Sequence, residues 1–500
     1  MEIQGKVCVR LGDNPGDNAA HLSPAPTLTW PFTVHRMWGK DSRPFRCTCV
    51  GRPRIPWRLV PVLPFRHQHD REILRLAVPA FGALIAEPMF LLADTAIVGR
   101  LGTRPLGGLG VAGQALTTVV NLCVFLAYGT TAAVARQIGA GRTRDAVRQG
   151  VDGLWLALTL GAVLIAAGWP LVPGIVHLFG ASPGVTPYAV TYLRISLFGV
   201  PGMLVVLAGT GVLRGLQDAV TPLVVAVAMF VGNGVLNGVF VLVLGWGIAG
   251  SAWGTVLAQT AGAAAYLVAV ARGARRHGAP LRPDLAGLRS AATAGVALVV
   301  RTATLRVVLV VATAVATRMG DVEIAAHQVA TQVWSLLSFA MDAIAIAGQA
   351  ITGRYLGASD VAGARAATRR MVEWGIGCGV LFAVLVIAAR PVLPGLFTTD
   401  PQVRALLMSV LWIVAAAQPL AGLVFVLDGV LIGAGDQRYL AVAGLLTMVA
   451  YLVAAYAVHV MDGGLVALWL AFCVWMLARG VTLGVRAYGD AWLVTGAVRR

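Results

Sequence analysis

From residue 72 almost to its end, the chain alternates long apolar runs with short breaks that contain Arg, Gly, Pro or Asp. Each run is long enough to cross a hydrocarbon core of roughly 30 Å as a helix that rises about 1.5 Å per residue. Lipid offers the backbone no hydrogen-bond partners, so segments that span it must be helices. We expect about twelve transmembrane helices, at residues 74–98, 106–133, 150–173, 187–213, 219–244, 248–271, 290–315, 323–350, 372–394, 404–432, 438–460 and 464–486.

The composition agrees with a membrane protein, because 58% of the residues are hydrophobic and only 12% are charged. Soluble domains carry roughly 25% charged residues. The net charge of +17 would suggest a nucleic-acid partner in a soluble protein. Here the arginines gather in the breaks after the second, sixth and eighth apolar runs, which the positive-inside rule assigns to the cytoplasm. We therefore expect a multi-pass protein of the cytoplasmic (inner) membrane, with both termini cytoplasmic and no nucleic-acid partner.

Residues 1–70 differ from the rest, since they mix Pro, Arg, His and Trp without a sustained period or an apolar run of about 20 residues. They are interpreted as a disordered basic tail or as the product of a start site placed too early. The six cysteines form no CxxC pair, and neither a disulfide framework nor a metal site is indicated.

An internal repeat organises the apolar runs. When the chain is shifted by 218 residues against itself, Gly139 falls on Gly357 and Asp218 falls on Asp436 without a gap. The string VLRGLQD at 212–218 then matches VLIGAGD at 430–436. The shift covers six helices, an even number, so both halves have the same topology and form a parallel repeat.

The repeat predicts an all-α polytopic membrane protein built from two homologous six-helix lobes. Two facing bundles with a cleft between them are typical of transporters, although a duplicated scaffold without transport activity remains an alternative. We expect a disordered tail (1–70), an N-lobe (72–276), a cytoplasmic linker (277–289), a C-lobe (290–487) and a short cytoplasmic tail (488–500).

Asp94, in the run FLLADTAIVGRLG, is the strongest candidate for chemistry. A carboxylate in the bilayer is costly, so it normally faces a cavity and has a function there. Burial disfavours its charged form, which suits an acid that loads and unloads protons. Asn233 and Asn237 are four residues apart in a later span, so they share a helix face and could hydrogen-bond to Asp94. Purely structural hydrogen bonds between helices are the alternative for all three residues.

Three residues of the first span suggest gating. Glu87 lies seven residues before Asp94, on roughly the same side of the helix. Pro79 and Pro88 each remove a backbone hydrogen bond from this span. The prolines predict either a helix that bends during transport or a static kink.

The second half offers a further set of candidates. An intramembrane arginine such as Arg301 needs a partner, which Asp342 or Asp428 could supply. Such a pair is either a structural lock or part of ion coupling or substrate contact. His327 could titrate near neutral pH, or it could be a hydrogen-bonded polar residue at the start of its helix.

Eight short motifs occur in order over about 400 residues and resemble those of the multidrug and toxic compound extrusion (MATE) transporters, in particular the DinF branch. They are DTAIVGRLG, ARQIGAGR, VLRGLQDAVTP, GNGVLN, LVVRTATLR, GDVEIAAHQ, GRYLGA and DGVLIGAGD. The resemblance implies cation-coupled export of amphipathic compounds by alternating access between two six-helix lobes.

The resemblance also implies roles for particular residues. Asp94 matches the proposed proton site of this branch, and Thr255 matches a hydroxyl near that site. A structural threonine that bonds back to its own helix is the alternative for Thr255. Many relatives have Asp where this chain has Asn237, so one titratable group is missing. Asp428 matches an acid linked to sodium in another branch, but the glutamate which that branch uses in the seventh span is absent. The first departure argues against a network of two carboxylates, and the missing glutamate favours protons over sodium.

We therefore expect a secondary active exporter of hydrophobic or cationic compounds that is coupled to inward proton flux, or less readily to sodium flux. A flippase for a lipid-linked or anionic amphiphile is the alternative. No ATP-binding or hydrolase motif occurs in the sequence. We expect no enzymatic activity, no cofactor beyond the ion gradient and a monomer whose partners are small molecules and the lipid bilayer.

Overall fold

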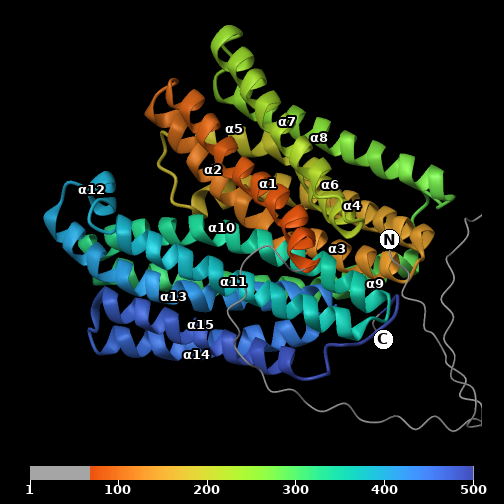
Figure 1. Cartoon of the computed structure of the whole chain (residues 1–500). Coiled ribbons are helices and arrows are strands. Elements are labelled where there is room, and N and C mark those ends of the chain that lie inside the picture. Colours follow the sequence, from red (N-terminus) through yellow and green to blue (C-terminus); the bar gives the residue numbers. More distant parts are fainter. Residues whose placement is uncertain (1–67, 499–500) are drawn as a thin grey trace, which may run out of the picture. The chain divides into compact units, whose positions relative to one another are not determined.

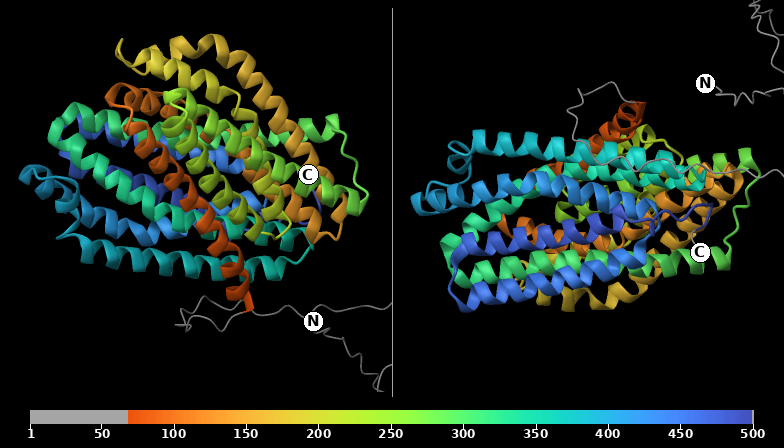
Figure 2. Two further views of the ribbon diagram at one scale, coloured as in Figure 1. Left: turned by 90° about the horizontal axis from the view of Figure 1, so that it is seen from above. Right: turned by 60° about the horizontal axis from the view of Figure 1, so that its bottom comes forward.

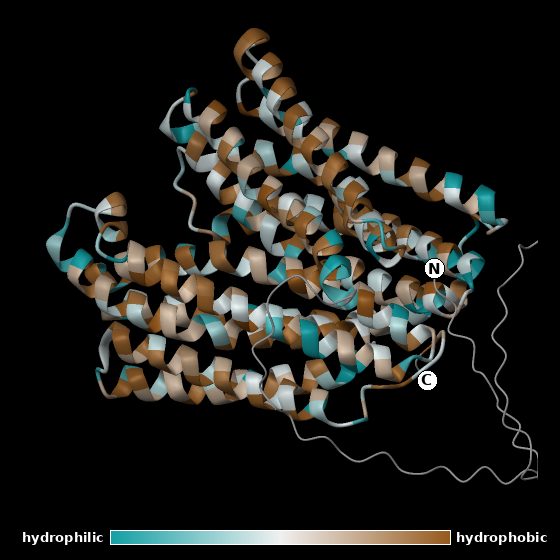
Figure 3. Cartoon of the chain, viewed as in Figure 1, coloured by the Kyte–Doolittle hydropathy of each residue, from teal (hydrophilic) through white to brown (hydrophobic). Residues whose placement is uncertain are grey.

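Long helices form nearly all of residues 68–498, the part of the chain that the computed structural model describes (Figure 1), and no strand occurs among these residues. The expected tail therefore lies outside the described residues, except for its last three residues, which already belong to the first helix. Eleven helices are long and apolar enough to span a membrane, or up to twelve spans are present when one bent pair is counted as a single span. Hydrophobic residues dominate along the helices, and hydrophilic ones gather toward their ends (Figure 3).

The first lobe runs from α1 to α8. Its α5–α6 pair is bent by 51° at a short break, directly before Pro201 in the first turn of α6. Proline fits the first turn of a helix but cannot continue the backbone hydrogen bonds of the preceding one. The elements are α1 (Gln68–Gly99), α2 (Thr103–Leu122), α3 (Phe125–Gly139), α4 (Thr143–Leu178), α5 (Thr186–Leu197), α6 (Val200–Gly215), α7 (Val220–Asn237), the π-helical segment η1 (Gly238–Val243) and α8 (Gly247–His277).

The second lobe runs from α9 to α15 and also supplies six spans, together with the short α12. The two groups of helices are seen from further sides in Figure 2. Each of the twelve expected spans coincides with a helix or a helix pair, which confirms the two-lobe architecture. The elements are α9 (Leu285–Met319), α10 (Asp321–Gly357), α11 (Val361–Ala389), α12 (Leu393–Phe397), α13 (Pro401–Gly433), α14 (Gln437–Val460) and α15 (Gly464–Tyr488).

The lobes meet through the ends of α3 and α10. Gly139, at the end of α3, leaves no room for a Cβ beside the Arg354 carbonyl of α10. Gly357, at the end of α10, leaves none beside the Arg136 carbonyl of α3. The two glycines are equivalent in the repeat, so the crossing is symmetric. Only glycine allows two helix backbones to approach this closely.

The C-terminal segment folds back onto this crossing, beyond what the expectation of a short tail implied. Arg136 of α3 donates to the carbonyls of Val494 at 2.7 Å and Gly496 at 3.0 Å. The Gly496 backbone N–H donates to the Leu356 carbonyl of α10 at 3.0 Å. The indole of Trp492 is almost fully buried. Residues after α15 thus contact both lobes.

Candidate functional site

Asp94 lies in the second half of α1, where only 2% of its surface is exposed. Its carboxyl group accepts hydrogen bonds from three other helices. The Tyr192 hydroxyl of α5 lies 3.3 Å from Oδ2, and the Asn237 amide of α7 donates to Oδ1. From α8, the Ser251 hydroxyl lies 3.4 Å from Oδ1 and the Thr255 hydroxyl 3.4 Å from Oδ2. Asp94 therefore joins α1 to α5, α7 and α8.

The two amides of α7 extend this network. Asn233 Nδ2 donates to Thr255 Oγ1 at 3.0 Å, and Asn237 Nδ2 lies 3.3 Å from Asn233 Oδ1. Both asparagines are fully buried. The structure thus brings together the four residues that the sequence pointed to in this lobe. Their role in cation coupling stays a prediction.

Sequence reasoning missed Tyr192 and Ser251. Ser251 lies four residues before Thr255, so both hydroxyls share one face of α8, and this spacing was a usable signal. Tyr192 comes from a different span, and nothing in its local sequence indicates that it faces Asp94. Only the packing of α5 against α8 and of α2 against α5 places it there.

All four groups around Asp94 are neutral, and each can donate a hydrogen to the carboxyl group. A carboxylate accepts such bonds on both oxygens, whereas a protonated carboxyl needs one acceptor for its own hydrogen. All four groups can donate to the ionised acid, and the protonated acid can be held when one of the three hydroxyls turns to accept its hydrogen. Asn237 Oδ1 is buried nearby and has no hydrogen-bond partner among the described residues.

Local backbone structure sets the position of Asn237. It is the last residue of α7, directly before the π-helical turn of η1. Such turns are rare and often occur at functional sites. Gly254 of α8 faces Asn237, and a Cβ at Gly254 would run into the Asn237 side-chain oxygen. The site thus depends on a glycine as well as on its polar residues.

The second lobe contains a buried ionic cluster. Arg301 of α9 forms a bidentate pair with Asp428 of α13, with Nε 3.0 Å from Oδ1 and an Nη2 contact to Oδ2. Arg479 of α15 lies 3.3 Å from the same Oδ2. The structure therefore gives Arg301 the partner that it was expected to need. Arg479, which the sequence analysis did not consider, belongs to the same cluster.

The other two candidates of this lobe lie differently. Asp342 of α10 is half-buried and interacts electrostatically with Arg301 and Arg479. His327 lines a separate cavity in the second lobe, together with Trp334, Tyr451, Trp469 and Phe472. The four candidates of the second lobe therefore do not form one site. Among residues 68–498, no group of His, Cys, Asp and Glu side chains could hold a metal ion.

The expected gating residues all lie within α1. Pro79 and Pro88 are both inside this helix, which runs unbroken from Gln68 to Gly99. The side chain of Glu87 lies outside the described part of the chain. α1 packs against α7 of its own lobe and against α10 of the other. α1 therefore contacts both lobes, and the gating role of Pro79, Glu87 and Pro88 stays a prediction.

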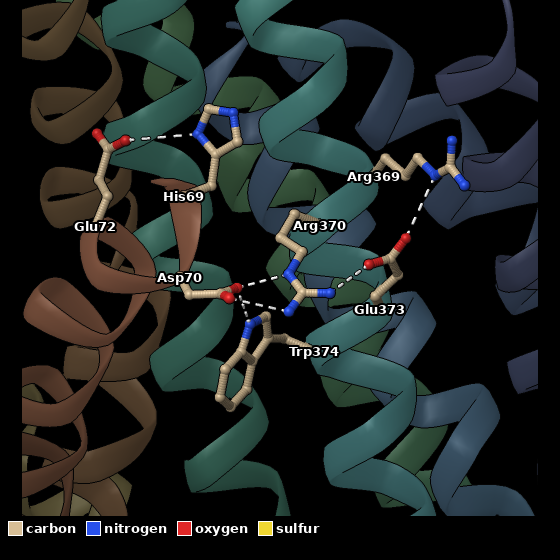
Figure 4. Close-up of polar contacts among 7 residues, drawn as sticks. All are labelled: His69, Asp70, Glu72, Arg369, Arg370, Glu373 and Trp374. Carbon is tan, nitrogen blue, oxygen red and sulfur yellow. Dashed lines mark hydrogen bonds and ion pairs between the residues drawn. The ribbon is translucent and has the colours of Figure 1, made fainter. Parts of the chain in front are cut away.

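The start of α1 is tied to the second lobe by ion pairs (Figure 4). Asp70 accepts from Arg370 of α11, with Oδ1 2.6 Å from Nε and Oδ2 3.0 Å from Nη2. The Trp374 indole adds a bond of 2.8 Å to Asp70 Oδ1. Glu72 pairs with Arg354 of α10. We call Asp70, Glu72, Arg354, Arg370 and Trp374 the α1 latch.

Comparison with known proteins identifies the family. The MatE family model matches residues 79–240 and residues 290–457, so it matches each half of the chain once. The chain is 32% identical to Protein DETOXIFICATION 44, chloroplastic, of Arabidopsis thaliana over 430 residues, which cover 82% of this chain and 80% of that protein. It is 27% identical to DNA damage-inducible protein F of Escherichia coli (strain K12) over 437 residues, which cover 84% and 92%.

Solved structures agree on the fold. A crystal structure of MATE in the bent conformation superposes with a TM-score of 0.77 at 21% identity and covers 85% of this chain and 95% of that one. An outward-facing multidrug resistance MATE transporter gives a TM-score of 0.74 at 20% identity, with 85% and 96% covered. Together with the two-lobe architecture, these matches confirm the resemblance seen in the sequence. The chain belongs to the MatE family of multidrug efflux transporters and is a multi-pass membrane protein.

Proposed function

We propose that the protein exports hydrophobic or cationic compounds in exchange for protons, and that Asp94 is the acid that carries the proton. A single cavity between the lobes would open alternately to the two sides of the membrane. The observation that carries the proposal is the set of neutral donors around the buried Asp94 carboxyl. Family membership supports transport as the activity, rather than enzymatic catalysis.

Protonation of Asp94 would change what its surroundings must supply. The neutral acid brings a hydroxyl hydrogen into this shell, so one of the surrounding hydroxyls must turn from donor to acceptor or the hydrogen must find another acceptor. Asn237 Oδ1, for which residues 68–498 supply no hydrogen-bond partner, is an acceptor that this hydrogen could use after a small rearrangement. The resulting shift of α1 against α7 and α8 is the step that would couple proton uptake to substrate release.

The distribution of arginines supports cytoplasmic termini in the inner membrane. Arginines gather in the α3–α4 and α8–α9 connections and in the helix ends that flank them, and the start of α11 adds further arginines at the same end. Protons would then enter through the opposite face, where they neutralise Asp94 while the cavity is open to the outside. We propose that a monomer carries out this cycle with no cofactor other than the ion gradient.

The test is the export of a cationic dye such as rhodamine 6G by full-length protein in proteoliposomes, under an imposed pH gradient and then under a sodium gradient. We expect the pH gradient to drive export and Asp94→Asn to abolish it. Asp321→Asn, at the exposed start of α10, is the matched control and should leave export unchanged. Export driven by sodium alone, or export that persists in Asp94→Asn, would contradict the proposal.

A further inference from the structure

Three arginines are buried inside the helical bundle. Arg214 of α6, Arg301 of α9 and Arg479 of α15 are exposed by only 8%, 8% and 9%. Arginine in the interior of a membrane protein is rare and usually lies beside a counter-charge or along a substrate path. Arg214 belongs to the first lobe and the other two belong to the second. The positive charge of these three arginines must therefore be balanced by anionic groups nearby.

Two carboxylates face the three arginines. Asp428 is already bonded to both Arg301 and Arg479. Asp342 interacts electrostatically with all three arginines but hydrogen-bonds to none of them among the described contacts. With both acids ionised, the cluster still carries one uncompensated positive charge. A buried cation without a partner is strongly unfavourable, so this excess points to a missing anion.

Among the described residues, no hydrogen bond or ion pair is found for the Arg214 side chain. Its Nε is buried and makes no hydrogen bond within the described residues, and the ion pairs of the cluster are formed by Arg301 and Arg479. Tyr128 of α3 interacts electrostatically with Arg214 and Arg301, and the Arg301 guanidinium lies 5.9 Å from the Tyr128 ring centre. Tyr128 thus links the arginine of the first lobe to the arginine pair of the second.

Tyr128 and Asp342 each keep part of their surface exposed, so protein atoms do not enclose the cluster completely. Guanidinium groups bind carboxylate, sulfonate or phosphate groups through two parallel hydrogen bonds, and Arg214 has this capacity unused. The apolar helices around the cluster suit the hydrophobic part of the same molecule.

We propose that Arg214, with Arg301 and Arg479 behind it, forms a site between the lobes for the anionic group of an amphipathic compound. The site widens the substrate range from cations to zwitterionic and anionic amphiphiles. Its place in the transport cycle rests on the export function proposed above, but the binding itself does not. The two can therefore be tested separately.

The test compares fluorescein with rhodamine 6G, two dyes that share a ring system and differ in charge. Binding of each to the purified full-length protein is measured by fluorescence polarisation, without any gradient. We expect wild-type protein to bind both dyes. Arg214→Gln should weaken fluorescein binding about tenfold or more, as for the loss of a charged hydrogen-bond donor, and leave rhodamine binding unchanged. Arg214→Lys, which keeps the charge, should retain most of the fluorescein affinity.

Two controls separate the possible explanations. Arg194→Gln removes an exposed arginine of α5 and should change neither affinity. Repeating the measurement in nanodiscs with and without phosphatidylglycerol distinguishes the source of the anion. Competition by this lipid assigns the site to an anionic headgroup, and its absence assigns the site to a soluble compound.

The proposal is overturned if wild-type protein does not bind fluorescein, or if Arg214→Gln weakens both dyes equally, because Arg214 would then serve the fold. Failure of the export proposal looks different. In that case fluorescein would still bind and lose affinity in Arg214→Gln, while a pH gradient would drive neither dye out of proteoliposomes.

Discussion

At the scale of single residues, the arrangement around Asp94 depends on a position that carries no polar group. Gly254 of α8 faces Asn237, so Gly254→Ala should push the amide away from Asp94 and reduce pH-driven export severalfold. Overpacking of this kind costs about 1–3 kcal/mol of stability. The measurements are dye export and thermal unfolding of the purified protein.

Gly273→Ala is the control for that prediction, since Gly273 lies in the same helix and has no atom within 4 Å of the position of a new Cβ. It should leave export unchanged and should not lower the unfolding midpoint. If Gly254→Ala behaves in the same way, Asn237 is not held by close packing, and the geometry around Asp94 is looser than proposed.

Some of these residues could be predicted from the sequence, and others could not. Asn233 and Asn237 could be placed together because a spacing of four fixes their shared face in any helix. Asp94 could be singled out because a carboxylate in an apolar run is costly. Tyr192 and Arg214 could not, because a tyrosine or an arginine near a span end is common, and its partner depends on how distant helices pack.

At the scale of helices, the α1 latch is a buried ionic contact between the lobes. Asp70 and Arg370 are exposed by 2% and 7%. Asp70→Asn removes the buried partner of Arg370 and leaves it only the more exposed Glu373, so we expect the protein to be destabilised by about 2 kcal/mol, as for the loss of hydrogen bonds to a charged group. The exposed Arg369–Glu373 pair in the same region is the comparison, and Arg369→Gln should cost about 0–1 kcal/mol. Equal shifts of the thermal midpoint in the two variants would show that the latch is not a buried pair in solution.

The crossing of α3 and α10 gives a prediction about conformation. Gly357→Val should prevent the close approach to the Arg136 carbonyl and hold the two helix ends apart. Spin labels at Arg144 and Ala362, equivalent and exposed positions at the starts of α4 and α11, report the separation of the lobes at this end. We expect longer distances and little export. Gly110→Val, where a Cβ meets no atom within 4 Å, should change neither, and an unchanged distance in Gly357→Val would mean that the crossing does not set closure.

At the scale of the whole molecule, length and repetition made most of the fold predictable. Apolar runs long enough to cross the bilayer fixed the number of spans, and the shift of 218 residues fixed the two lobes. The bend between α5 and α6 and the π-helical turn of η1 were not predicted, because each involves only a few residues within a run that is apolar throughout. The folded-back C-terminal segment was not predicted, because it accepts hydrogen bonds from Arg136 through backbone carbonyls, and every residue type has such a carbonyl.

That C-terminal segment supports the last prediction. Arg136 of α3 donates to the carbonyls of Val494 and Gly496, and Gly496 in turn donates to Leu356 of α10, so the segment bridges the two lobes at their closed end. Removing residues 489–500 deprives Arg136 of two of its three described acceptors, leaving the Ala434 carbonyl. We expect this truncation to lengthen the Arg144–Ala362 spin-label distances and to lower the thermal midpoint. Removing only residues 497–500 keeps both bonds and should leave the distances as in the full chain. If both truncations give the distances of the full chain, the segment rests on the closed lobes without helping to hold them together.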